Sequence, residues 1–409
     1  MSEIEKKALG ISCFLLVTGL MGVDFFNPSL PYIMASLHVS QTSMKNLIVV
    51  YMLVLGLAQF FYGSFSDRYG RKPAIAAGFA IAVVGLAGSA FAHGIDALYL
   101  ARGVTAFGTA GCTVISRALI VDVFHDQRAL KKAFSYFAMS SQLSPAMAPL
   151  LGGVIQQYWG WRASFAVFAL VMSLSLVFIL IAMPETHTSN ERSVLSWRDV
   201  CTPYLKLLSN FKFIAYSLAS ALMFSFTIGY YSASPYAFHA LGYSPVTNSL
   251  FYLSYSTAIL FGAGLLSSVL SAIRSPRLYL GAVISYSAIF LIALPLNISD
   301  SGVKIVIFSF FLGATSGVGG TLALVLSMSS VETSRGATSA LQGAIKMFFT
   351  GVFLLAFDVI HIVSFTSLIE VFLFLVLFLW LIWVLDFARE KRLRKNAAGT
   401  CGHTSPILE

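Results

Sequence analysis

The stretch GSFSDRYGRKP, residues 63–73, separates two apolar runs that are each long enough to cross a lipid bilayer. A plain loop on the cytoplasmic side of a membrane would explain its basic residues. It would not explain an aspartate and two spaced glycines, which allow charge pairing at a helix end, a tight turn and close helix packing. We therefore interpret the stretch as a lock between helices, and its gating residues are Gly63, Asp67, Arg68, Gly70 and Arg71.

The composition of the whole chain is that of a membrane protein. The 409 residues have a mean hydropathy of +0.82, and 57% are hydrophobic while 11% are charged; a soluble domain carries about 25% charged residues. Nearly all of the net charge of +9 falls in loops and tails, so it predicts topology and not nucleic-acid binding. The four cysteines and seven histidines show no metal or disulfide spacing. We expect no metal, no cofactor and no enzyme activity.

Apolar runs of this length recur along the chain. We expect twelve membrane-spanning helices, at residues 9–34, 45–65, 74–92, 97–121, 132–156, 163–183, 211–238, 249–271, 277–295, 302–327, 337–358 and 362–386. The polar segment 184–210 divides them into six plus six. The expected fold is an all-α integral membrane protein with a bundle over 1–183, a cytoplasmic linker over 184–210, a second bundle over 211–386 and a basic tail over 387–409.

Charge predicts the orientation of these spans. With both termini inside the cell, twenty basic residues fall in inward segments and three, Lys45, Arg162 and Lys304, in outward segments. Inward loops carry the excess of lysine and arginine, so we expect both ends to be cytoplasmic. The first span is not followed by a small-residue cleavage site, which indicates a retained span and not a signal peptide.

A carboxylate interrupts the first span, in MGVDFFNPSLPYI at residues 21–33. Asp24 is followed by Asn27 and two prolines, Pro28 and Pro31. Carboxylates inside spans usually face a bundle interior or water, and the prolines free backbone carbonyls and kink the helix. We interpret the stretch as a proton and substrate site, in which Asp24 carries the proton and Asn27 lines a substrate cavity. The alternative is a structural pairing of Asp24 with Asn27 or with a neighbouring arginine.

Other polar and aromatic residues inside spans are further candidates. Tyr230, Tyr231 and Tyr236 are candidates for the wall of the substrate cavity. Lys346 lies about 15 Å into its span at 1.5 Å per residue. It is too deep to reach the interface and either forms a structural ion pair, for example with Asp24, or attracts an anionic substrate group.

Two basic residues and an acidic one lie near the ends of the span at 97–121. Asp122 and Arg117 lie at its inner end, where we expect both to join Asp67 and Arg71 in a cytoplasmic charge cluster. Arg102 lies near its outer end, where the residues alone allow snorkelling to the outer interface as well as a role in proton coupling.

Several of these stretches resemble one known family. Residues 63–73 resemble the major facilitator signature between helices 2 and 3, and Arg102 is similar to the arginine of that family's helix 4 motif. The segment APLLGG, residues 148–153, resembles its helix 5 antiporter motif. Residues 21–33 and SASPYAFHALGYSP, residues 232–245, are similar to the helix 1 and helix 7 segments of the bicyclomycin/chloramphenicol resistance subfamily.

The resemblance implies a major facilitator fold with two pseudo-symmetric bundles that rock around a central site. It further implies that Arg102 takes part in proton coupling, and that Pro149, Gly152 and Gly153 seal the two halves on one side. The subfamily pattern has no lysine at the position of Lys346.

The implied function is a drug:proton antiporter of the bacterial inner membrane, which exports small drug-like molecules as a monomer. Its partners would be the substrate, protons and the lipid bilayer, without nucleic acid. Two alternatives stay open. The first is an exporter of an endogenous anionic metabolite such as a carboxylate siderophore, which Lys346 and Arg102 favour. The second is an importer of the same fold.

Overall fold

The computed structural model of the chain describes residues 2–124, 126–141, 143–186, 197–268, 275–331, 335–359 and 365–401. The helices of the first half are α1 (Glu3–Asp24), η1 (Asn27–Ser29), α2 (Leu30–Leu37), α3 (Gln41–Tyr69), α4 (Arg71–Ala90), α5 (Ile95–Val123), α6 (Gln127–Ser141) and α7 (Leu143–Ala182). Those of the second half are α8 (Trp197–Leu208), α9 (Phe211–Ala240), α10 (Pro245–Ser268), α11 (Ser275–Ala293), η3 (Leu294–Leu296), η4 (Ile298–Asp300), α12 (Gly302–Ser329), α13 (Arg335–Val359) and α14 (Phe365–Cys401).

Side-chain caps mark the starts of several helices. Ser2 accepts a hydrogen bond from the backbone N–H of Glu5, and the Glu5 carboxylate accepts one from the Ser2 backbone, so a complete capping box begins α1. Asn210 accepts from the N–H of Phe213 at the start of α9. The local sequence therefore specifies these boundaries without help from the membrane.

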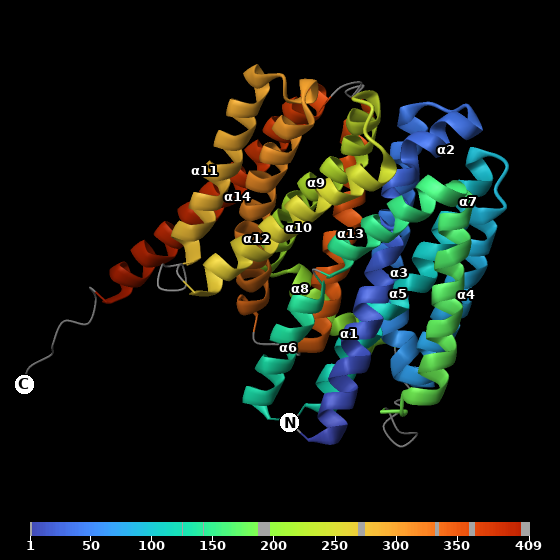
Figure 1. Cartoon of the computed structure of the whole chain (residues 1–409). Helices are drawn as coiled ribbons and strands as arrows, with labels where there is room; N and C mark the ends of the chain where they lie inside the picture. The colour runs from blue at the N-terminus through green and yellow to red at the C-terminus, as the bar shows by residue number, and fades with distance from the viewer. Residues whose placement is uncertain are drawn as a thin grey trace, which may run out of the picture.

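Twelve membrane crossings are present in the described part of the chain, as predicted. Eleven helical stretches are long and apolar enough to cross a bilayer, and one of them, Lys132–Ala182, is 51 residues long. Figure 1 shows that α7 turns back on itself. The backbone leaves the helical conformation at Gly160, whose φ of +81° favours glycine. It therefore crosses twice. The middle of the predicted linker, 187–196, lies outside the described residues, and α8 follows it.

The helices form two bundles that lie side by side (Figure 1). Helices α1 to α7 pack on one another in the first bundle, and α9 to α14 in the second. Two pairs make most of the contact between bundles, α3 with α13 and α7 with α10. The α3–α13 pair is very close, because a methyl group at Gly56 would lie 2.6 Å from the backbone nitrogen of Phe348. The pair therefore needs glycine at this point.

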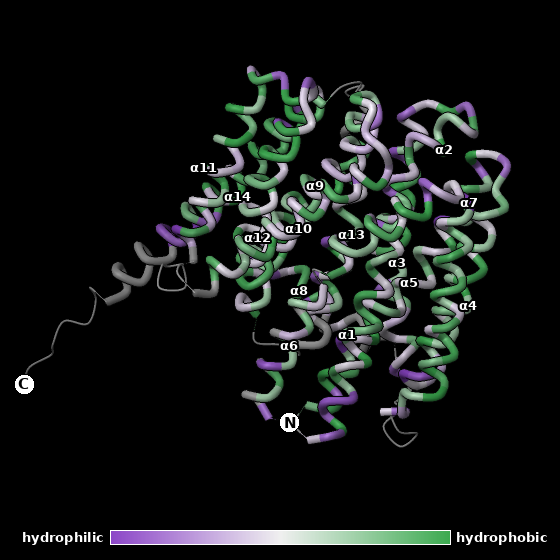
Figure 2. The backbone as a smooth tube through the Cα atoms, viewed as in Figure 1, coloured by the Kyte–Doolittle hydropathy of each residue, from purple (hydrophilic) through white to green (hydrophobic). Residues whose placement is uncertain are grey.

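The helix ends define two membrane faces. We call the face that carries Glu3, Gly70 and Gln127 the N-terminal face, and the other, which carries Gly94 and Gly160, the opposite face. Apolar residues cover most of the helices between these faces, and hydrophilic residues concentrate towards the ends (Figure 2). This is the pattern of a chain whose side chains face lipid around its middle.

Candidate functional site

Asp24 is the last residue of α1 and stands at a break in the first span. The chain continues through η1 and α2 after an interruption at Phe25 and Phe26. Pro28 has no N–H, so the carbonyl of Asp24 lacks the donor that a continuous helix would supply. The break leaves polar backbone inside the bundle, where the sequence predicted it.

The Asp24 carboxyl group is buried with little compensation. Its residue is 5% exposed, and Asn27 Nδ2 donates to Asp24 Oδ1 at a long 3.5 Å. No described arginine or lysine forms an ion pair with it. Of the two structural pairings predicted for Asp24, the one with Asn27 is present, and the one with an arginine is wrong for the described residues. The second amide atom of Asn27, Oδ1, is buried and has no described hydrogen-bond partner.

Arg102 supports the break in α1 from the neighbouring helix α5. Its side chain is 1% exposed, and Nη2 donates to the carbonyl of Gly22 at 2.9 Å. The guanidinium carbon lies 4.0 Å from the ring centre of Phe26 and 4.1 Å from that of Tyr51, both favourable cation–π distances. Snorkelling to the outer interface is therefore wrong. The guanidinium instead binds a carbonyl at the end of α1.

A cluster of tyrosines from the second bundle faces Asp24. Tyr230 and Tyr231 of α9 pack on Tyr252 and Tyr255 of α10, with ring centres 5.2 Å apart for Tyr230–Tyr255 and 4.9 Å for Tyr231–Tyr252. All four are at most 1% exposed. Three of them, Tyr231, Tyr252 and Tyr255, interact electrostatically with Asp24. The segment η1, which follows Asp24, contacts both α9 and α10, so the carboxyl group of one bundle lies near the aromatic cluster of the other.

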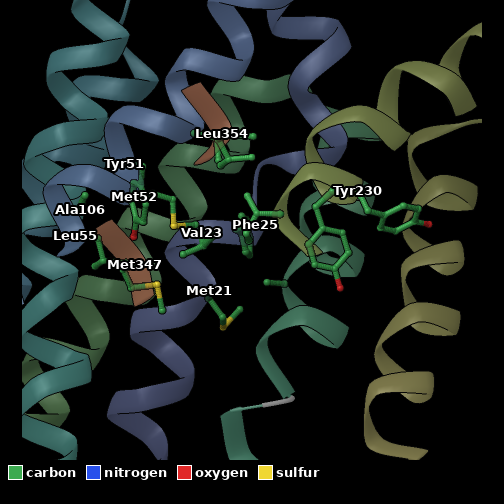
Figure 3. Packing of buried hydrophobic residues seen from close by; sticks show 14 of the residues in the cluster. Met21, Val23, Phe25, Tyr51, Met52, Leu55, Ala106, Tyr230, Met347 and Leu354 are labelled. Carbon is green, nitrogen blue, oxygen red and sulfur yellow. The ribbon is translucent and has the colours of Figure 1, made fainter. Parts of the chain in front are cut away.

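Figure 3 shows the hydrophobic residues around this meeting point. Met52 and Leu55 of α3 and Met347 of α13 belong to the same buried cluster as Phe25, which follows α1, and Tyr230 of α9. Both bundles therefore contribute to one continuous core. A movement of one bundle against the other must repack these side chains.

Two of the three predicted tyrosines lie in this aromatic cluster and the third does not. Tyr230 and Tyr231 are in the cluster, whereas Tyr236 lies further along α9, half-buried, with a hydroxyl that has no described partner. Sequence reasoning missed Tyr252 and Tyr255. The two tyrosines are about one helical turn apart on an apolar span, and this spacing could have predicted that they share one face of the helix.

Arg71 is the centre of a charge cluster on the N-terminal face. Its Nε donates to Asp122 Oδ2 at 3.0 Å, its Nη1 donates to Ser66 Oγ at 2.7 Å, and Nη1 also pairs with Asp67. Gly70 has φ +101°, so the turn that brings Arg71 back to Asp67 needs a glycine. The cluster joins α3, α4 and α5, as the sequence predicted for Asp67, Arg71 and Asp122.

Two further residues, which the sequence analysis did not assign to this cluster, complete it. The Glu185 carboxylate accepts from the backbone N–H groups of Arg71 at 2.9 Å and Lys72 at 3.1 Å, where it caps the first turn of α4. Thr186 Oγ1 donates to Asp122 Oδ2 at 3.2 Å. The end of α7 is thereby tied to α4 and α5.

Two predicted gating residues lie outside the cluster. Arg68 is exposed, and its guanidinium lies over the ring of Tyr69 at 5.4 Å. Gly63 faces the linker helix α8, because a methyl group there would lie 3.7 Å from the hydroxyl of Tyr204. Arg117 does not join the cluster either. It points to the second bundle and donates to the carbonyl of Ser339 at 3.0 Å.

Pro149, Gly152 and Gly153 lie in the half of α7 that approaches the opposite face. All three are buried. A methyl group at Gly152 would overlap the carbonyl oxygen of Phe25, at the break of α1. One at Gly153 would overlap Ser249 Oγ of α10 and lie 2.7 Å from the carbonyl of Pro245. Gly152 thus permits contact within the first bundle, and Gly153 contact between the bundles.

The comparison with known families agrees with this architecture. The model of the Major Facilitator Superfamily matches residues 12–356. The chain belongs to the Major Facilitator Superfamily. Its fold of two six-helix bundles is therefore confirmed from both the helices and the family match.

Relatives within the superfamily carry names of resistance proteins. The chain is 26% identical over 261 residues to the bicyclomycin resistance protein homolog of Haemophilus influenzae, which covers 62% of this chain and 65% of the relative. It is 26% identical over 287 residues to the chloramphenicol resistance protein of Pseudomonas aeruginosa, covering 69% and 67%. The chain thus spans about two thirds of the length of each relative. The predicted resemblance to bicyclomycin and chloramphenicol resistance proteins is confirmed.

A solved structure supports the fold independently. The D-xylose-proton symporter superimposes with a TM-score of 0.70 over 92% of this chain and 96% of that chain, at 15% sequence identity. At this identity the similarity concerns the fold alone.

Asp122→Asn is expected to lower the melting temperature of this superfamily member. The change removes the charge that Arg71 faces across α4 and α5, and breaking a partly buried, charge-assisted hydrogen bond costs about 1–3 kcal/mol. The melting temperature of the purified protein in neutral-lipid nanodiscs measures the loss. Arg68→Gln, which changes an exposed residue outside the cluster, is the control. Equal melting temperatures for Asp122→Asn and the wild type would contradict a stabilising cluster.

Proposed function

We propose that this protein is a proton-coupled efflux transporter of the bacterial inner membrane that exports small, drug-like molecules. The observation that carries the proposal is the buried Asp24 at the break of α1, opposite the tyrosines of the second bundle. The names of the relatives, which are those of proteins of bicyclomycin and chloramphenicol resistance, support a role in handling drug-like small molecules. The positive charge of the loops on the N-terminal face supports a cytoplasmic location for that face and for both termini.

The proton would be coupled to the movement of the bundles through Asp24. Burying an ionised carboxylate without a cation costs several kcal/mol, so the closed contact between bundles favours the neutral carboxyl group. When the bundles separate on one side, water reaches the group and its ionised form becomes acceptable. Proton binding thus favours closure, and proton release favours opening, which couples the proton to the movement of the bundles.

Arg102 is a positioning residue in this proposal. Its hydrogen bond to the carbonyl of Gly22 fixes the end of α1, and with it Asp24. Its guanidinium makes cation–π contacts with Phe26 and Tyr51. The substrate would occupy the region between Asp24, Asn27 and the tyrosines of α9 and α10 when the bundles are apart. Aromatic rings suit drug-like molecules because they offer large apolar area and few charges.

The test is transport by the purified protein in proteoliposomes. We expect radiolabelled chloramphenicol to accumulate when the vesicle interior is acidic, and the accumulation to collapse when a protonophore removes the pH gradient. Protein-free liposomes are the control. Accumulation that survives the protonophore would overturn proton coupling. A knockout strain, compared with its parent for drug sensitivity and for secreted metabolites, identifies the natural substrate.

A further inference from the structure

Two cations of different bundles meet in the half of the molecule near the N-terminal face. Arg117 extends from α5 and donates to the carbonyl of Ser339 on α13 at 3.0 Å. Lys346 lies two turns further along α13, and its Nζ is 4.0 Å from the ring centre of Phe224 on α9. The two cations interact electrostatically. Arg117 also packs against Gly343, which lies one helical turn from Lys346, and like charges in a membrane-spanning part of the chain repel each other.

No described carboxylate balances this pair. Neither Arg117 nor Lys346 forms an ion pair within the described residues, where the ion pairs present are those of Arg71, Lys212 and Lys304. Asp24, the partner that the sequence suggested for Lys346, is bonded to Asn27 instead. Cations inside spans are normally paired or face water, so the missing partner requires an explanation.

Gln59 of α3 adds a buried amide without a described hydrogen-bond partner at the same place. It is 1% exposed, and neither Oε1 nor Nε2 has a described hydrogen-bond partner. A methyl group at Gly343 would lie 2.8 Å from Gln59 Oε1 and 2.5 Å from Arg117 Nη1, so both side chains pack against this glycine. A buried primary amide without partners costs about 1–3 kcal/mol or more, and a ligand can offset that cost.

We propose that Arg117, Lys346 and Gln59 form a binding site for an oxyanion group, a carboxylate or a phosphate, of the transported molecule. The guanidinium supplies a planar pair of N–H donors, the ammonium supplies a point charge, and the amide supplies a neutral donor. Together they match an oxyanion, whose oxygens accept several charge-assisted hydrogen bonds. Because Arg117 belongs to one bundle and Lys346 to the other, a bound anion would also hold the bundles together at this face.

The inference rests on the proposed function for the role of the anion as a substrate, and it adds molecules that carry an oxyanion group to the substrates of that function. Binding itself does not depend on proton coupling. A binding measurement therefore separates the two. If an anion binds at these residues but no proton-driven transport follows, the efflux proposal fails and the site stands.

The test measures the melting temperature of the purified full chain in nanodiscs of neutral lipid, with increasing concentrations of added ligand. Citrate supplies carboxylates, inorganic phosphate supplies a phosphate, and trimethyl citrate supplies the citrate skeleton without charge. We expect citrate or phosphate to raise the melting temperature in a saturable way, and trimethyl citrate to have no effect. The arm that saturates identifies the kind of oxyanion. If neither anion raises it, the proposal is wrong.

Variants assign the effect to the three residues. Lys346→Met and Arg117→Gln are each expected to weaken anion binding by about tenfold or more, since one charge-assisted hydrogen bond is lost. Arg277→Gln, which removes an exposed cation of α11, is the matched control and should bind as the wild type does. Should either variant fail to fold, Lys346→Arg keeps the charge and should keep binding, while Gln59→Leu should weaken it. Wild-type affinity in Lys346→Met or in Gln59→Leu overturns the proposal.

Discussion

Asp24→Asn is expected to abolish pH-gradient-driven efflux while leaving insertion and folding intact. Asparagine has nearly the shape of aspartate, so the packing against Asn27 and the tyrosines is kept. It cannot take up or release a proton, so the two conformations no longer differ in proton affinity. A proton gradient can only drive transport through such a difference. Accumulation in proteoliposomes should therefore fall to the level of protein-free vesicles.

The matched control for this change is a second buried acid. Asp386 of α14 is 5% exposed, the same as Asp24, but it accepts a hydrogen bond from the Tyr216 hydroxyl at 2.6 Å and lies 3.7 Å from Lys212 Nζ. Asp386→Asn should keep proton-driven transport because this acid is already paired within its own bundle. Asp24→Glu should keep part of it. Proton-driven accumulation by Asp24→Asn at the wild-type rate would show that another group carries the proton.

The sequence predicted those features that depend on neighbouring residues or on the periodicity of apolar residues. Apolar runs specify the spans, and the turn at Gly70 follows from a glycine between two helices. Asp122 could be assigned to the cluster of Asp67 and Arg71 because all three lie at the ends of spans on one membrane face. Position along the membrane normal, in short, can be read from a sequence.

The direction of a side chain around its helix was harder to predict. Arg117 and Asp122 are five residues apart, which places them about 140° apart on a helix of 3.6 residues per turn. One therefore faces Arg71 and the other faces α13. This angle would have predicted that Arg117 and Asp122 face different neighbours and do not belong to one cluster.

Other features of the site depend on tertiary structure alone. Arg102 binds the Gly22 carbonyl because α1 breaks beside it, and nothing near Arg102 in the sequence indicates this. Glu185 follows a span and looks like a loop residue until the start of α4 is placed next to it. Such contacts join residues far apart in the chain, and periodicity does not report them.

Gly153→Val is expected to open the opposite face of the molecule. Gly153 of α7 packs on the carbonyl of Pro245 and on Ser249 of α10, and the Pro245 carbonyl belongs to backbone that cannot rotate away. Inserting a larger side chain into such a contact typically costs about 1–3 kcal/mol. Because the contact joins the two bundles, the strain is relieved when they separate. A shift of about 1.4 kcal/mol changes the ratio of open to closed molecules about tenfold.

Cysteine labelling measures this opening. Asn248 of α10 is 4% exposed and adjoins Ser249, so Asn248→Cys, in a chain whose four natural cysteines are replaced by serine, reports access to the contact. A membrane-impermeant maleimide added at the opposite face should label it about tenfold faster in Gly153→Val. Gly281→Val is the matched control, because no atom lies within 4 Å of a methyl group at that position. Equal labelling in the two variants would refute the seal.

Gly152→Ala distinguishes two explanations for the opening, the loss of a contact between the bundles and a general distortion of α7. The added methyl group would meet the carbonyl of Phe25, which lies in the same bundle at the break of α1. Separation of the bundles does not relieve that strain, so Gly152→Ala should lower the melting temperature without raising the labelling of Asn248→Cys. Two adjacent glycines would then differ in effect because one faces its own bundle and the other faces its neighbour. If both variants raised labelling alike, the opening would follow from distortion of α7 and not from loss of the contact with α10.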